Sequence, residues 1–202
     1  MSYQSAEMMP ALVLATVLLA LCNPASAGST EGRTRPRPAS WAQPVDMPGL
    51  PNLHRVSTGL FRGAQPEPQG FRSLVKMGIK TVVNLRQLHS DRDEMDEAGV
   101  ADDLDYVHIR FNPFHPEDED VVEFLKVIAD PAKRPVFVHC RHGADRTGMM
   151  VAIYRIVFQG WTKKQAIEEM TTGGFGFHGI WKNLVRYVRK VDVEVLRRKA
   201  GL

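Results

Sequence analysis

The 202-residue chain lacks the features that mark several large classes of protein. Its two cysteines, Cys22 and Cys140, are too few for a disulfide framework or a four-cysteine zinc site. No apolar run is long enough to span a bilayer comfortably. The net charge is only +3 with both signs spread along the chain, so we expect no nucleic-acid partner. A composition of 44% hydrophobic and 24% charged residues is that of an ordinary globular protein of about one domain.

The N-terminal part of the chain has the pattern of a secretory leader. Residues 11–22 form an apolar run, and the small residues Ala25, Ser26 and Ala27 follow it. We expect a signal peptide over residues 1–27, and a periplasmic or secreted protein with no stable membrane anchor after cleavage. The segment before the apolar run has no Lys or Arg, so a buried N-terminal helix is the alternative. Residues 28–53 are rich in proline without an apolar period, which predicts a linker or an arm laid over the domain.

From His54 onward, short apolar runs alternate with helical patterns. Strands are predicted over residues 56–62, 79–85, 106–111 and 135–138, and helices over 71–77, 91–98, 121–128, 148–159, 163–170 and from Gly179 to the end. This alternation predicts a single α/β domain over residues 54–202, with a mostly parallel central sheet flanked by helices.

One polar loop carries the chemistry. Residues 139–148 read HCRHGADRTG and lie between a buried strand and an apolar helix. A loop that joins a strand to a helix N-terminus directs backbone N–H groups and the positive end of the helix dipole at one point, which favours an anion. Cys140 begins this loop and Arg146 ends it. A phosphate held by the amides would be gripped by the planar guanidinium while the sulfur lies beneath the phosphorus.

The loop must also ionise the thiol. An unperturbed cysteine has a pKa of about 8.5 and is only a few per cent thiolate near neutral pH. Making a thiol mostly ionised requires about 4 kcal/mol, of which the helix dipole supplies at most ~2 kcal/mol. We therefore expect the loop amides and Arg146 to supply the remainder. Gly143 is expected to permit a turn that a side chain would obstruct, and Thr147 to donate its hydroxyl to the sulfur.

These residues resemble the His-Cys-x5-Arg-Ser/Thr signature of the cysteine-dependent phosphatases, and in particular their atypical dual-specificity branch of small bacterial and plant-fungal proteins. Further segments are similar to that branch: residues 60–66 (LFRGAQP), 83–86 (VNLR) and 174–178 (GFGFH). The resemblance implies that Cys140 is the nucleophile and Arg146 the phosphate clamp, with no metal and no cofactor. It also implies a cysteinyl-phosphate intermediate that water hydrolyses. Substrate binding is assigned to Arg141, His142, Gly143, Ala144, Asp145 and Thr147.

The general acid is less evident, because the loop after the strand at 106–111 offers Asn112 where an aspartate is commonly met. Asp118 is the first choice, with helix capping as its alternative role. Asp145 is the second choice, because its place before Arg146 is similar to the aspartate of some inositide phosphatases. Its alternative role is an ion pair with Arg146.

Other candidates have simpler interpretations. We expect His115, His142 and His178 to be hydrogen-bonded rather than metal-bound, because no two share a helix at ligand spacing. Arg62 and Arg86 border the predicted cleft or form ion pairs.

The predicted function is hydrolysis of a phosphomonoester on a protein or a small molecule, by a monomer. Hydrolysis of inositol phosphates and a catalytically silent phosphate-binding module are the alternatives. A rhodanese-like sulfur transferase or an arsenate reductase fits less well, because the loop is one residue too long for the first and the second needs partner cysteines.

Overall fold

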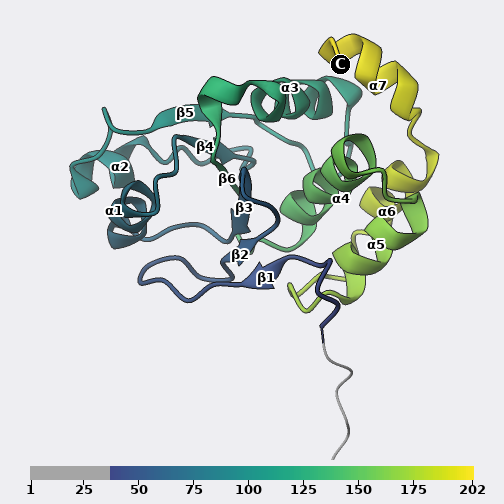
Figure 1. The fold of residues 1–202 in the computed structure, drawn as a ribbon. Coiled ribbons are helices and arrows are strands. Elements are labelled where there is room, and N and C mark those ends of the chain that lie inside the picture. Colours follow the sequence, from purple (N-terminus) through teal and green to yellow (C-terminus); the bar gives the residue numbers. More distant parts are fainter. Residues whose placement is uncertain (1–36) are drawn as a thin grey trace, which may run out of the picture. The chain divides into compact units, whose positions relative to one another are not determined.

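A six-stranded sheet forms the centre of the protein in the computed structural model, which describes residues 37–202 (Figure 1). Its strands are β1 (Gln43–Pro44), β2 (His54–Arg55), β3 (Leu60–Gly63), β4 (Thr81–Asn84), β5 (Asp105–His108) and β6 (Val136–His139). The strand order is β1-β2-β3-β6-β4-β5, in which β3, β6, β4 and β5 are parallel and β1 and β2 are antiparallel. The predicted mostly parallel sheet is confirmed, with an antiparallel edge that was not expected.

Helices cover both faces of this sheet (Figure 1). They are α1 (Pro68–Lys76), α2 (Arg92–Ala98), α3 (Asp118–Ala129), α4 (Asp145–Gln159), α5 (Lys163–Thr172), α6 (Lys182–Lys190) and α7 (Val193–Ala200), with a short 3-10 turn, η1 (Pro131–Lys133). Successive strand residues point to opposite faces. Thus Val82 and Phe137 pack with α1 and α2, whereas Val83 and Val138 pack with α3 to α7. The α/β prediction is therefore confirmed for the described residues.

Two predicted elements are divided in the structure. Of the predicted strand over residues 56–62, residues 56–59 form a bend after β2, and the remainder belongs to β3, which begins at Leu60. The predicted long C-terminal helix is two helices, because the chain becomes extended at Val191 and the Asp192 carboxylate caps a new helix by accepting from the N–H groups of Glu194 and Val195. The prediction of one continuous helix was therefore wrong.

The described part of the proline-rich segment belongs to the folded unit, which extends from Arg37 to Leu202. Ala42, Leu50 and Leu53 are buried, and the backbone N–H of Ala42 donates to the Glu169 carboxylate at 2.6 Å. The folded unit thus starts before the predicted boundary at His54, because isolated apolar residues fill gaps in the core without any periodic pattern. The predicted signal peptide lies outside the described residues.

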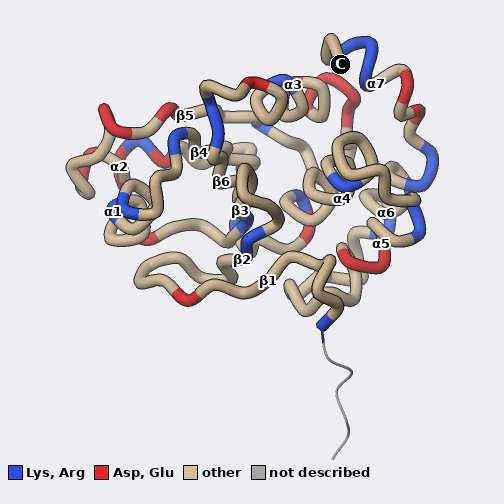
Figure 2. Tube along the Cα trace, in the orientation of Figure 1, with Lys and Arg blue, Asp and Glu red and all other residues tan. Residues whose placement is uncertain are grey.

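Charged residues of both signs occur throughout the fold (Figure 2). Acidic side chains gather on α2 and basic ones along α6. Among the described residues, no helix combines the length and the apolar character needed to cross a membrane.

Candidate active site

The predicted catalytic loop lies at the carboxyl end of a central strand. β6 ends at His139, the loop runs through residues 140–144, and α4 begins at Asp145. β6 has a parallel neighbour on each side, β3 and β4. The loop therefore lies where parallel strands end and a helix N-terminus begins, which is where α/β sheets commonly bind ligands.

Gly143 determines how closely this loop packs on the sheet. Its φ of +68° lies in the left-handed region, and a Cβ added there would be 2.4 Å from the carbonyl carbon and oxygen of Gly63 at the end of β3. Both constraints exclude any other residue without movement of the backbone. The predicted need for glycine in this turn is confirmed, and the close approach to Gly63 adds a second reason.

Three successive carbonyls of the loop are held from outside. The Arg141 carbonyl accepts from the Gln65 N–H at 3.3 Å and the His142 carbonyl from Asn52 Nδ2 at 2.9 Å. The Gly143 carbonyl accepts from the Arg62 guanidinium at 2.6 Å. In a trans peptide the C=O and the following N–H point in opposite directions. The N–H groups of residues 142–144 are therefore directed away from these donors, toward the inside of the loop.

The two residues at the ends of the signature occupy different depths. Cys140 is a free thiol with 2% of its surface exposed, and it packs against the core. Arg146 is half-buried in the first turn of α4 and donates to the Leu85 carbonyl at 3.1 Å. The Thr147 hydroxyl is buried and has no hydrogen-bond partner among the described residues. The predicted hydrogen bond from Thr147 to the sulfur is thus not formed in this structure.

Arg62 is a buried cation beneath the loop. Its side chain is fully buried, and its guanidinium lies 3.7 Å from the centre of the Phe175 ring. Burial lowers the pKa of Arg62 to about 10, against the opposing electrostatic effects of Glu169 and Cys140. The prediction placed Arg62 at the cleft border or in an ion pair. The structure instead shows it supporting the Gly143 carbonyl from below, a role that needs the tertiary fold to be seen.

A pocket of about 300 Å³ lies at the mouth of the loop. Arg141, His142, Asp145 and Arg146 line one side of it, so the structure brings these predicted site residues together. The remaining walls are His178 and the apolar side chains of Pro113, Ile180 and Trp181. The lining of the pocket therefore combines two arginines with apolar side chains.

Asp145 is bonded to His178 and not to Arg146. One carboxylate oxygen accepts from the backbone N–H of His178 at 2.8 Å, and the other lies 2.9 Å from the Nδ1 of the same residue. The alternative role of Asp145, an ion pair with Arg146, is therefore not observed. Because residues 145 and 178 come from different elements, their pairing gave no sequence signal.

Asp118 lies apart from this pocket. Its carboxylate accepts from the Tyr187 hydroxyl at 2.8 Å and lies 3.5 Å from the Lys199 ammonium. Asp118 is the first residue of α3, whereas Glu117 occupies the N-cap position without a side-chain cap. Neither the predicted capping role nor a position in the pocket is observed for Asp118, because its side chain points to α6 and α7.

A buried network behind the loop was missed by the sequence analysis. His139 Nε2 lies 2.7 Å from an Asp91 oxygen, and Asp91 also accepts from Gln65 and Asn84. Burial raises the pKa of Asp91, but the charge and hydrogen bond of His139, helped by the Gln65 hydrogen bond, outweigh this and hold it below its usual range. The network fixes the end of β6 immediately before Cys140.

Metal-ligand residue types cluster twice in the described chain: His142 with Asp145 and His178, and His89 with Asp91 and Glu94. Both Asp145 oxygens already accept hydrogen bonds from His178, and Asp91 is occupied by the network behind the loop. In each group the aspartate is thus already hydrogen-bonded.

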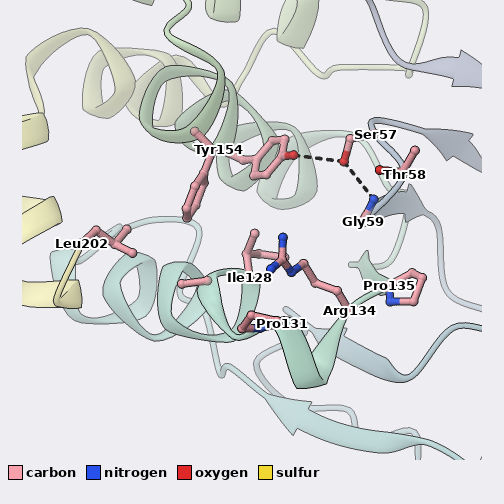
Figure 3. Close-up of a pocket in the computed structure, with 11 residues that line it drawn as sticks. Ser57, Thr58, Gly59, Ile128, Pro131, Arg134, Pro135, Tyr154 and Leu202 are labelled. Atoms are coloured by element: carbon pink, nitrogen blue, oxygen red, sulfur yellow. Dashed lines mark hydrogen bonds between the residues drawn. The ribbon is translucent and has the colours of Figure 1, made fainter.

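A larger cavity, of about 690 Å³, lies away from the loop (Figure 3). It is lined by the turn before β3, the end of α3, α4 and the C-terminal Leu202, and the side chain of Arg134 extends into it. The Tyr154 hydroxyl is bonded to Ser57 there at 3.0 Å. No residue of the loop lines this cavity, so the smaller pocket is the candidate active site.

Comparisons with known proteins agree with this geometry. Residues 50–186 match the family model described as a DSP-PTPase phosphatase fused to NAD+ kinase. The dual specificity protein phosphatase TpbA of Pseudomonas aeruginosa is 40% identical over 192 residues, which cover 92% of this chain and 82% of the relative. An inositol diphosphatase of Arabidopsis thaliana is 27% identical over 129 residues, 58% of this chain and 60% of the relative.

Solved structures show the same likeness. The crystal structure of P. aeruginosa TpbA superimposes with a TM-score of 0.71 at 36% identity, covering 82% of this chain and 99% of the other. A Cys-to-Ser variant of TpbA in complex with phosphotyrosine has a TM-score of 0.70 at 36% identity, covering 82% and 98%. Because the family model spans more than half of the chain and TpbA matches nearly all of it, this protein belongs to the cysteine-dependent dual-specificity phosphatases.

Proposed function

We propose that the protein hydrolyses phosphotyrosine and related phosphomonoesters through a cysteinyl-phosphate intermediate. The observation that carries this proposal is the outward anchoring of three loop carbonyls above the buried Cys140. A loop whose N–H groups are preorganised toward its own interior binds an oxyanion without rearranging when the substrate arrives.

Each residue of the loop has a role in this reaction. The loop amides bind the non-bridging phosphate oxygens, and the Arg146 guanidinium binds two of them as their charge grows in the transition state. The Cys140 thiolate attacks the phosphorus in line, and the bond to the leaving oxygen breaks with its electron pair. Water then attacks the phosphocysteine, which releases phosphate and restores the thiolate.

The walls of the pocket favour an aromatic substrate. Pro113, Ile180 and Trp181 line it beside the cationic residues, and Ile180 is 79% exposed. A phosphotyrosine ring would bury apolar surface against these side chains while its phosphate reaches the loop. The TpbA variant solved with phosphotyrosine supports the same substrate class.

Inositol phosphates are the second candidate. Arg141, His142 and Arg146 gather at the mouth of the loop, where they would face additional phosphate groups. The Arabidopsis relatives named inositol diphosphatases share 27–29% identity with this chain.

A substrate panel tests the proposal. We expect the full chain to hydrolyse an aryl phosphate and a phosphotyrosyl peptide in the presence of EDTA, and more slowly a phosphoseryl peptide and an inositol pyrophosphate. Cys140→Ser is expected to abolish turnover, and Arg146→Lys to reduce it strongly because a bidentate contact is lost. Activity that survives Cys140→Ser, or that requires added metal, would overturn the mechanism.

We also propose that the protein is exported, cleaved after Ala27 and active as a monomer. The leader pattern over residues 1–27 supports export, and the folded unit begins at Arg37, so this cleavage removes none of it. N-terminal sequencing of the protein from a periplasmic extract should give Gly28 as the first residue. Light scattering of the same material checks the monomer.

A further inference from the structure

The proposed reaction needs a proton donor for the leaving oxygen, and the pocket offers few. The titratable or charged side chains that line it are Arg141, His142, Asp145, Arg146 and His178. The two arginines remain charged near neutral pH and are not proton donors. Asp118 is bonded to Tyr187 and Lys199 elsewhere. The choice therefore falls on His142, Asp145 and His178.

Asp145 and His178 form an oriented pair. Asp145 is 7% exposed at the start of α4, and its two oxygens take the backbone N–H and the Nδ1 of His178. Two contacts to one carboxylate fix both the backbone and the ring of residue 178. The His178 side chain is 48% exposed, and its Nε2 makes no hydrogen bond within the described chain. Nε2 is thus the nitrogen available to a substrate.

His142 lacks such an orienting partner. Its ring centre lies 5.2 Å from that of His178, and no described side chain hydrogen-bonds to its ring. Asp145 itself has both oxygens occupied by His178 and little exposed surface, so it is suited to hold the imidazolium rather than to reach the substrate.

We propose that His178, positioned by Asp145, is the general acid of this phosphatase; the assignment rests on the proposed function. As the Cys140 thiolate attacks, the phosphorus–oxygen bond breaks and its electron pair passes to the leaving oxygen. That oxygen takes the proton from Nε2 of the His178 imidazolium, which leaves neutral imidazole. In the second step Nε2 accepts a proton from the attacking water, the phosphorus–sulfur bond breaks, and thiolate and imidazolium are restored. The Asp145 carboxylate stabilises the imidazolium and does not itself take the proton.

Leaving-group dependence tests this assignment. His178→Asn keeps an amide near the position of Nδ1, and hence a donor to Asp145, but removes Nε2. Loss of a general acid typically costs 10²- to 10⁴-fold. We expect kcat/KM of this variant to fall at least ~100-fold for phenyl phosphate, and under about tenfold for p-nitrophenyl phosphate, whose leaving group needs no protonation.

Two control variants show whether the leaving-group dependence is specific to His178. His115→Asn repeats the substitution at a histidine whose side chain is 79% exposed and which does not line this pocket, and should leave both rates unchanged. Asp118→Asn should affect both esters equally or not at all. A leaving-group dependence in Asp118→Asn, or an equal loss on both esters in His178→Asn, overturns the assignment while Cys140-dependent turnover remains. Turnover that persists in Cys140→Ser overturns the proposed function instead, and the assignment with it.

Discussion

Gly143→Ala tests how the loop is held in place. The left-handed backbone costs an alanine about 1–2 kcal/mol, of which up to about 1 kcal/mol is offset because alanine restricts the unfolded chain. The larger effect is steric, because the new Cβ would lie 2.4 Å from the Gly63 carbonyl and 2.6 Å from the Ala64 nitrogen. Ordinary contact begins at 3.4 Å, so the loop must move by about 1 Å, a displacement that can cost 10²-fold in rate.

Gly99→Ala is the matched control, because Gly99 ends α2 with a φ of +69° and has nothing within 4 Å of an added Cβ. We expect Gly99→Ala to lower the free energy of unfolding only by the net cost of placing an alanine in the left-handed backbone conformation, and to leave the activity unchanged. Gly143→Ala should lose a further 1–3 kcal/mol, typical of overpacking, and about 100-fold in kcat/KM on an aryl phosphate. Denaturant unfolding and steady-state kinetics measure both. Equal unfolding free energies for the two variants, with full activity in Gly143→Ala, would refute the packing argument.

Three other predictions concern residues outside the loop. Arg62→Met leaves the buried Gly143 carbonyl unpaired, so it should cost about 1–3 kcal/mol of stability and at least tenfold in kcat. Arg55→Met, on the exposed side of β2, is the control and should change neither quantity. An active and stable Arg62→Met variant would contradict the supporting role of Arg62. The pKa of Asp91 is depressed in the folded state, so its contribution to stability is fully present above pH ~4 and is lost as the pH falls through the folded value. The difference in unfolding free energy between wild type and Asp91→Asn should therefore shrink in acid, and a constant difference would refute the ionised pair. Asp192→Ala removes the cap of α7, so it should lose ~1 kcal/mol of stability with unchanged kcat. Thermal unfolding and an activity assay measure the two quantities. A fall in kcat would contradict this prediction and would show that α7 supports the site.

The structural features that could be predicted from the sequence are those that depend on residues close together along the chain. The alternation of apolar runs predicts the α/β sheet, and the spacing from Cys140 to Arg146 predicts a loop at a helix N-terminus. Features that join distant segments have no such signal. Arg62 supports Gly143 from 81 positions away, and Asp145 pairs with His178 from 33 positions away.

For Asp118, the position in the sequence indicated a place near the site that the fold does not give it. An acidic residue before an amphipathic helix has several ordinary roles, and only the packing of α6 and α7 on α3 determines that its carboxylate meets Tyr187 and Lys199. Proximity in sequence to a strand end therefore did not bring this carboxylate to the pocket.

The contacts of the N-terminal segment also constrain the order of folding. Ala42 is bonded to Glu169 across 127 positions, and Arg37 to the Gly173 carbonyl across 136. Residues that leave the ribosome early must wait for α5 before they find their partners, and long-range closures of this kind slow folding. A nascent chain that stops before Glu169 would lack both of these contacts, however complete its catalytic loop.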